Sequence, residues 1–179
     1  MRRLFSLILF VAVVFAGLLA AGMIQNRLPW TQPPGPGERI RTYLNTHVAE
    51  TVECSPFPEL RPRHYEHLRP PELLADVQQA IGKLTGWHVV EHDPAHRALH
   101  AVVTTTLCRF HDDVRVRVEP DAAADGAVLL IRSESRVGKG DLGANTRHLL
   151  DLYAQLDAMV PPPPTAAYKT PPARTTPLF

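Results

Sequence analysis

The chain has 179 residues and a formal net charge of +1, because 19 lysines and arginines face 18 acidic residues. This length fits one domain of ordinary size and not two. The basic residues are scattered rather than clustered, which excludes the strong positive field typical of nucleic-acid-binding proteins, so no nucleic acid is expected as a partner.

The N-terminus predicts a membrane segment. Met1-Arg2-Arg3 precedes an apolar run over residues 4–24, in which Ser6 is the only polar side chain. As a helix this run is about 31 Å long, enough to cross the hydrocarbon core of a lipid bilayer. The basic residues before it predict that the N-terminus stays inside the cell and the rest is exported. The length favours an uncleaved anchor over residues 1–25; a cleaved signal peptide ending at Ala20-Ala21-Gly22 is the alternative.

Proline and glycine mark the limits of the expected domain. Residues 26–39 are rich in both, which predicts a linker that lifts the domain off the bilayer. Residues 161–179 hold many prolines and few apolar side chains, so a disordered tail is expected there. The folded domain is therefore expected over residues 40–160.

A helix is expected from residue 70. The sequence Pro-Pro-Glu at 70–72 is typical of a first helical turn, and Gly86 ends the pattern. Between them apolar residues recur at helical spacing: Leu73, Leu74, Val77, Ile81 and Leu84.

Strands are expected at residues 87–91, 98–106, 114–119 and 128–133. The third is the clearest, because Val114, Val116 and Val118 alternate with charged residues, which predicts one buried and one wet face. The turns between these strands are short, and short connections require antiparallel neighbours. A second helix is expected over about 145–159. The predicted fold class is α+β: a four-stranded antiparallel sheet with two helices packed on one face, preceded by one transmembrane helix.

A polar motif spans the third and fourth predicted strands. It reads Phe110-His111-Asp112-Asp113-Val114 and resumes over residues 132–147 as Arg-Ser-Glu-Ser-Arg-Val-Gly-Lys-Gly-Asp-Leu-Gly-Ala-Asn-Thr-Arg. These residues resemble the bacterial family catalogued as domain of unknown function 1499, over roughly residues 50–158. Members are often exported or membrane-attached. This agrees with the anchor predicted from residues 4–24, and the expected location is the bacterial inner membrane, with a single span, the N-terminus in the cytoplasm and the domain in the periplasm or outside the cell. The chain departs from the family at residues 53–56, where Glu-Cys-Ser-Pro stands in place of Asn-Cys-Val-Ser-Ser.

The resemblance assigns no activity, but it implies a cluster that binds a ligand or supports the fold: Asp112, Asp113, Arg132, Ser133, Ser135, Arg136, Asp141, Asn145 and Arg147. Asp141 or Asn145 is expected to cap the last helix. Arg132 and Arg136 are expected to pair with an aspartate on the neighbouring strand. A small anionic ligand fits such a helix N-terminus, and a purely architectural network is the alternative. Neighbouring residues on a strand point to opposite faces, so the two aspartates are not expected to form a catalytic pair.

Histidines and cysteines leave two further alternatives open. His88, His92 and His100 are candidate ligands for zinc or copper if a hairpin gathers them on one face; solvent-exposed histidines without a metal are the other interpretation. No cofactor is expected. Cys54 and Cys108 are the only cysteines. Outside the cytoplasm they pair as a disulfide or stay as two separate thiols.

The expected function is a non-enzymatic binding or structural module of the cell envelope. Its expected partners are the lipid bilayer, through residues 4–24, and an envelope protein or small anionic ligand. A hydrolase acting on envelope material and a metal-handling protein are the alternatives. No catalytic residue is assigned, because spacing alone connects no nucleophile to a base.

Overall fold

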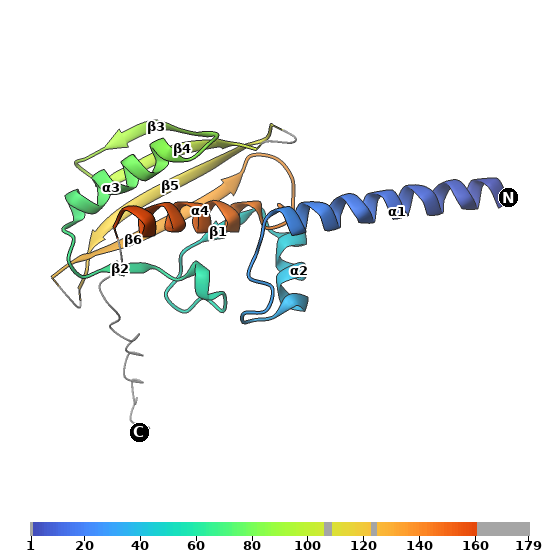
Figure 1. Ribbon diagram of the computed structural model, residues 1–179, viewed down its shortest axis with the longest axis horizontal. Helices are drawn as coiled ribbons and strands as arrows, with labels where there is room; N and C mark the ends of the chain where they lie inside the picture. The colour runs from blue at the N-terminus through green and yellow to red at the C-terminus, as the bar shows by residue number, and fades with distance from the viewer. Residues whose placement is uncertain (1, 106–108, 123–124, 161–179) are drawn as a thin grey trace, which may run out of the picture.

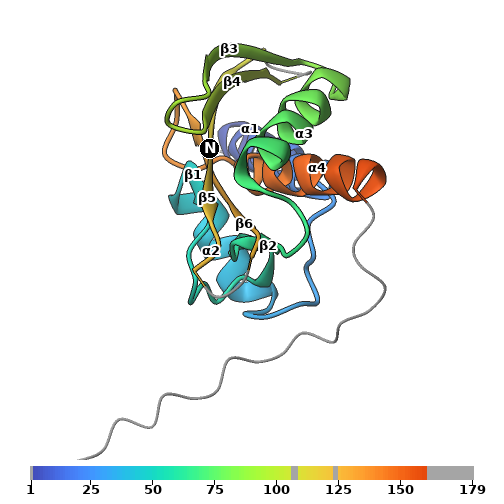
Figure 2. The ribbon, with the colours of Figure 1, turned by 90° about the vertical axis from the view of Figure 1, so that its left-hand side faces the viewer.

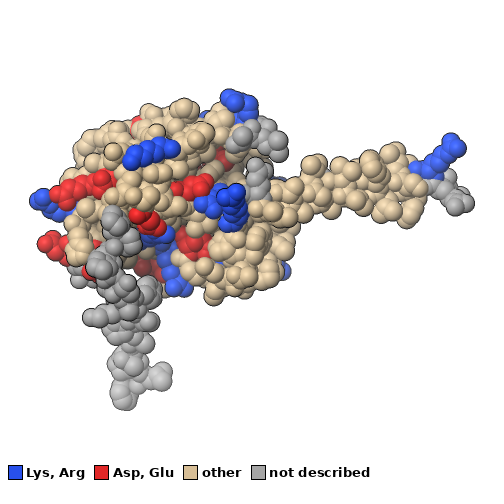
Figure 3. Space-filling model, in the orientation of Figure 1, with Lys and Arg blue, Asp and Glu red and all other residues tan. Residues whose placement is uncertain are grey.

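Helix α1, Arg2–Gln25, projects from the rest of the molecule (Figure 1). The computed structural model describes residues 2–105, 109–122 and 125–160. Within α1, Arg3–Ile24 is long and apolar enough to cross a membrane, with a mean hydropathy of 2.8. Its large apolar side chains that lie open to solvent are 45% to 72% exposed. In the space-filling view α1 carries charge only at its N-terminal end (Figure 3).

The chain beyond α1 folds around one antiparallel sheet. Its strands are β1 (Val48–Glu50), β2 (Arg63–Tyr65), β3 (Trp87–Asp93), β4 (Ala98–Thr104), β5 (His111–Pro120) and β6 (Ala127–Ser135). They lie in the order β1-β6-β5-β4-β3, and β2 also pairs with β6. Since β5 occupies one edge of β6, the short strands β1 and β2 share its other edge.

The α+β class and the antiparallel pairing are confirmed, but the predicted count of four strands is wrong, because the sheet has six. The two additional strands, β1 and β2, are three residues long each. Such short segments show no periodic pattern of their own, and their extended form comes from pairing with β6. The predicted alternation in β5 is confirmed, with its three valines buried.

Helices α3 (Pro70–Lys83) and α4 (Ala144–Met159) lie on one face of the sheet, and none of the described helices covers the other face (Figure 2). Both were expected from the sequence. The main core lies between these helices and the sheet, where Leu73, Val77, Val114 and Leu149 are fully buried. This arrangement leaves one face of a curved sheet open to solvent.

A second, smaller core joins α1 to the domain. It contains Leu28, Tyr43 and Phe57 and is built on helix α2 (Pro36–Asn45) and the 3-10 turn η1 (Pro58–Leu60), neither of which was expected from the sequence. Arg39 is fully buried there and forms an ion pair with Glu59. Its guanidinium also donates to the carbonyls of Gln32 and Pro33, within the stretch expected as a linker.

Candidate functional site

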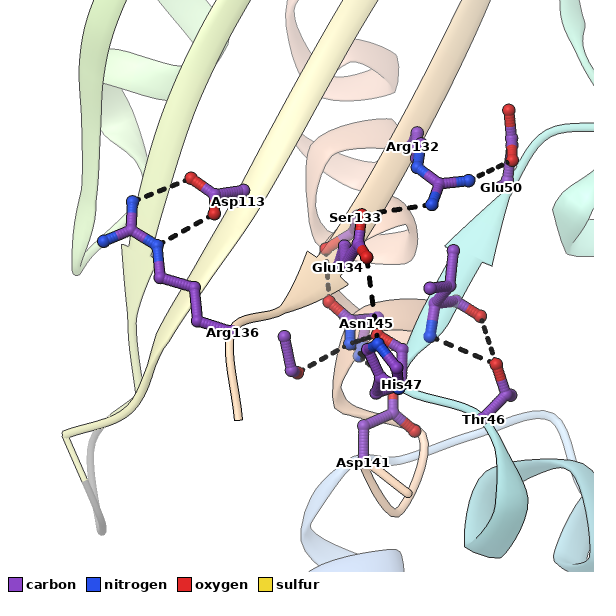
Figure 4. Close-up of polar contacts among 12 residues, drawn as sticks. Thr46, His47, Glu50, Asp113, Arg132, Ser133, Glu134, Arg136, Asp141 and Asn145 are labelled. Carbon is purple, nitrogen blue, oxygen red and sulfur yellow. Dashed lines mark hydrogen bonds and ion pairs between the residues drawn. The ribbon is translucent and has the colours of Figure 1, made fainter. Parts of the chain in front are cut away.

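The polar motif is divided between the two faces of the sheet. Side chains alternate along a strand, so in β6 Ser133 points toward the helices while its neighbour Arg132 points to the open face. Asp112 and Asp113 on β5 are divided in the same way, and only Asp112 is buried. The close-up separates the two groups: the ion pair of Asp113 lies apart from the contacts around Ser133 (Figure 4). One motif thus builds two clusters.

Asn145, in the first turn of α4, is the centre of the buried cluster. Its Nδ2 carries two hydrogens and lies 2.8 Å from each of three acceptors, the carbonyl oxygen of His47, Oγ of Ser135 and Oδ2 of Asp141, so two of these acceptors share one hydrogen. Its Oδ1 accepts from Oγ of Ser133 at 2.6 Å. The Asn145 side chain therefore joins α4, the end of β6, the loop after β6 and the residues before β1 (Figure 4).

Asp141 caps the start of α4. Its carboxylate accepts from the backbone N–H groups of Gly143 at 2.8 Å and Asn145 at 2.9 Å. Burial raises the pKa of Asp141, and these hydrogen bonds oppose the rise. Gly143 has a φ of 83°, a left-handed conformation that glycine adopts without strain. The loop and its carboxylate therefore satisfy N–H groups that a helix start leaves free.

The hydrogen bonds of Ser133 determine which ring nitrogen of His148 carries the proton. The hydroxyl proton of Ser133 goes to Asn145, so its oxygen must accept from Nδ1 of His148, 3.1 Å away. In this tautomer Nε2 of His148 carries no hydrogen, and it lies 3.7 Å from Oδ2 of Asp112. That oxygen is buried without a hydrogen-bond partner. Burial raises the pKa of Asp112 and lowers that of His148 to about 4, so burial disfavours the charged form of both groups.

Ser133, His148 and Asp112 are the residue types of a serine hydrolase, but their geometry is not that of a nucleophile. Ser133 is 0% exposed, Asp112 1% and His148 7%, so a substrate has no access to the hydroxyl. The serine proton is directed to an amide, not to the imidazole that would have to remove it. As it stands, the cluster ties α4 to the sheet.

Asp113 is the centre of the ion pairs on the open face. Arg136 donates to it twice, from Nε and Nη2, both at 2.8 Å, and Nε2 of His100 lies 2.8 Å from the same carboxylate. These hydrogen bonds, those from Arg136 first, hold the pKa of Asp113 well below its usual range. Asp113 is therefore a carboxylate at any pH in the physiological range.

The open face is hollowed by a groove of about 470 Å³. Arg115 lies in it directly opposite Arg132 in the β5–β6 ladder, and like charges so placed repel each other. Arg132 is neutralised by Glu50 at 2.6 Å and Glu134 at 3.0 Å. Arg115 has no carboxylate partner within the described part of the chain. The ionisable side chains along the groove are Glu50, Glu91, Asp93, His100, Arg115, Arg117 and Arg132.

The hairpin histidines do not gather. His88 and His100 lie on the open face, paired with Val102 and Glu91, whereas His92 is paired with Leu99 on the helix face. Among the described residues no group of three histidine, cysteine or acidic side chains is placed to hold a metal. The alternative in which a hairpin gathers the three on one face is therefore not realised, because a bulge between Val89 and Glu91 shifts the register.

The remaining predicted residues lie elsewhere. Arg147 pairs with Asp151 one turn along α4, outside both clusters. Cys54 is exposed, and Cys108 falls outside the described residues, so the predicted disulfide stays a prediction.

Two residues that matter here, His148 and Arg115, were not selected from the sequence. His148 follows Asn145 by three residues, a spacing that places both on one helix face. Nothing in the sequence indicated Arg115 in the same way, because its position opposite Arg132 depends on how β5 and β6 pair.

Comparison with known proteins gives a family and no activity. A family model described as a protein of unknown function (DUF1499) matches residues 39–156. No curated protein matches the chain significantly. The matched range contains the buried cluster and the groove, and it excludes α1.

Proposed function

The chain belongs to this family of proteins of unknown function, DUF1499, and we propose that it is a non-enzymatic binding module attached to a membrane by α1. Its ligand carries an anionic group and lies in the groove on the open face of the sheet. In this proposal the buried cluster shapes the domain and the groove binds the ligand.

The anchor is supported by the environment of α1. A helix of 22 residues, Arg3–Ile24, is about 33 Å long, which matches the hydrocarbon core. None of its most apolar window is buried against protein, so a bilayer is the environment that suits these side chains. From the basic residues before the run we infer that the domain faces the periplasm of a bacterial inner membrane, or the cell exterior.

The observation that carries the ligand proposal is the unpaired Arg115. Arginines in this groove are otherwise matched by carboxylates: Arg132 by two glutamates and Arg117 by Glu119. A carboxylate or phosphate of a ligand would neutralise Arg115 and relieve its repulsion from Arg132. Arg115 is exposed at the surface of the groove, so a ligand reaches it without rearrangement of the core.

A second unpaired charge refines the ligand. Glu91 on β3 lines the same groove and has no cationic partner within the described part of the chain. Glu91 is paired with His100 on β4, and His100 is paired with Arg115 on β5. The backbones of Glu91 and Arg115 are therefore two strand spacings apart, about 10 Å. A ligand with an acidic and a basic group at that separation, as in a short peptide, engages both.

Calorimetric titration of the full chain in lipid nanodiscs tests the groove. The probes are inorganic phosphate, succinate and a peptide with one acidic and one basic end. Arg115→Gln is expected to weaken binding about tenfold or more, the value of a charge-assisted hydrogen bond, without loss of stability. Arg41→Gln, on the exposed side of α2, is the matched control and should bind as the natural chain does. Equal binding by both variants, or binding of none of the three probes, would contradict the proposal.

A hydrolase is the alternative, favoured by the contact of Ser133 with His148 and of His148 with Asp112. Its test is a serine-directed fluorophosphonate followed by peptide mass spectrometry. Because Ser133 is fully buried, no adduct is expected on it. A stoichiometric adduct on Ser133 that disappears in His148→Gln would establish the hydrolase instead.

A further inference from the structure

The base of α1 is held rigidly against the loop that follows β6. Asn26 donates from Nδ2 to the carbonyl of Leu142 at 2.9 Å. A Cβ on Gly22 would lie 3.0 Å from Cδ1 of Leu142, so helix and loop are in close contact. Met23, still within α1, packs on the second core around Leu28. The direction of α1 relative to the domain is therefore set by packing.

Three segments of the domain lie around the contact between α1 and the loop that follows β6. Leu142 donates its N–H to the carbonyl of Tyr43, and Gly140 lies so close to Leu44 that a side chain would clash with its backbone. At the other end of the loop, Arg136 donates its N–H to the carbonyl of His111. The loop after β6, the end of α2 and the start of β5 thus lie side by side, at the end from which α1 emerges (Figure 1).

This end exposes apolar and basic side chains together. Val137 is 69% exposed, Phe110 53% and Leu44 42%. Arg109, next to Phe110, and Lys139, two residues after Val137, are exposed in the same segments and have no carboxylate partner within the described part of the chain. We call these five residues the rim. Exposed apolar side chains mixed with unpaired cations are typical of surfaces that lie in the headgroup layer of an anionic membrane.

We propose that the rim rests on the bilayer that α1 crosses and binds anionic phospholipid headgroups there. The inference rests on the proposed anchoring by α1, whose direction places this end of the domain nearest the membrane. The apolar side chains reach the boundary of the acyl chains, and the two cations, Arg109 and Lys139, face the phosphates. Bound in this way, the domain holds the groove at a constant angle to the membrane.

Depth measurements on the full chain test the contact. A fluorescent amino acid replaces Val137 or, as a reference, Ala95, which is exposed in the β3–β4 turn at the opposite end of the domain (Figure 1). The protein is reconstituted in vesicles of phosphatidylcholine, with or without phosphatidylglycerol, that carry a nitroxide at the headgroup. The label at position 137 should be quenched more strongly than that at 95, and more strongly with the anionic lipid.

Two exposed lysines provide a matched pair of variants. Lys139→Gln, in the rim, is expected to lower the ratio of docked to undocked domain about fivefold in anionic vesicles, the value of one cation near such a surface. Lys83→Gln, at the end of α3, removes the same charge outside the rim and should change nothing. Equal quenching at both labels, or equal loss in both variants, would overturn the proposal.

Flotation of the same vesicles separates the two possible failures. Protein that does not float with the lipid is not anchored, and both the anchor and the rim are then refuted. Protein that floats but shows equal quenching at positions 137 and 95 refutes the rim alone.

Discussion

Asn145→Ala is expected to be among the most damaging single substitutions in this domain. Its amide contacts four partners, accepting from Ser133 and sharing its two hydrogens among His47, Ser135 and Asp141. A net value of about 1 kcal/mol for each neutral bond and about 2 kcal/mol for the one to a carboxylate gives a loss of about 3 to 5 kcal/mol. Domains of this kind unfold at a cost of about 5 to 15 kcal/mol, so the loss takes a large share of the total.

Urea unfolding of the full chain in mild detergent measures this loss by tryptophan fluorescence, since Trp87 lies edge-on to His148 at a ring distance of 5.7 Å. Asn145→Asp preserves the side-chain shape but places a second carboxylate beside Asp141, so it should cost at least as much. Asn45→Ala is the matched control: that asparagine is exposed and bonds only to a carbonyl within its own helix. A loss for Asn145→Ala no larger than that of the control would refute the reasoning.

Further expectations concern pH and backbone conformation. Because burial lowers the pKa of His148 to about 4 from its ordinary 6.5, the unfolded chain binds a proton in this range that the folded chain does not. The stability from this group is complete above pH 6.5 and falls toward pH 4, by on the order of 3 kcal/mol. Gly82→Ala, within α3 and without neighbours inside 4 Å, should stabilise the domain by about 0.5 to 1 kcal/mol. Gly143→Ala should cost at least about 1 to 2 kcal/mol, because its φ is positive and its Cβ would overlap Leu28.

Controls for these expectations come from the same residues. Urea midpoints measured from pH 4 to 7 should lose part of their slope in His148→Gln, and an unchanged slope would contradict the assignment of a neutral His148. The two glycine variants control each other in thermal unfolding. If Gly143→Ala is as stable as Gly82→Ala, neither the positive φ of Gly143 nor its close contact with Leu28 affects the free energy of unfolding as expected.

The two faces of β6 explain why one polar stretch of sequence contributes both to the buried cluster and to the groove. Ser133 and Ser135 complete a buried network, while Arg132 between them takes part in the ion pairs of the open face. A substitution at Arg132 is therefore expected to affect the groove, and one at Ser133 the fold. Separate measurements of binding and stability distinguish these outcomes.

Local patterns in the sequence determined the elements that carry their own period. The apolar run before Ile24, the helical spacing from Leu73 to Leu84 and the alternation of Val114 to Val118 depend on neighbours within one segment. The helices α3 and α4 and the four longer strands could be predicted for this reason, and so could the antiparallel pairing, because the turns between these strands are short.

Only the tertiary structure decided what depends on partners far along the chain. Strands β1 and β2 exist because β6 offers a free edge, and α2 is held by the buried guanidinium of Arg39. The opposition of Arg115 and Arg132 depends on a register that no single strand contains. The long apolar helix α1 could be predicted from the first residues, whereas its contact with the domain could not, because Asn26 and Leu142 are 116 positions apart and meet only in the folded chain.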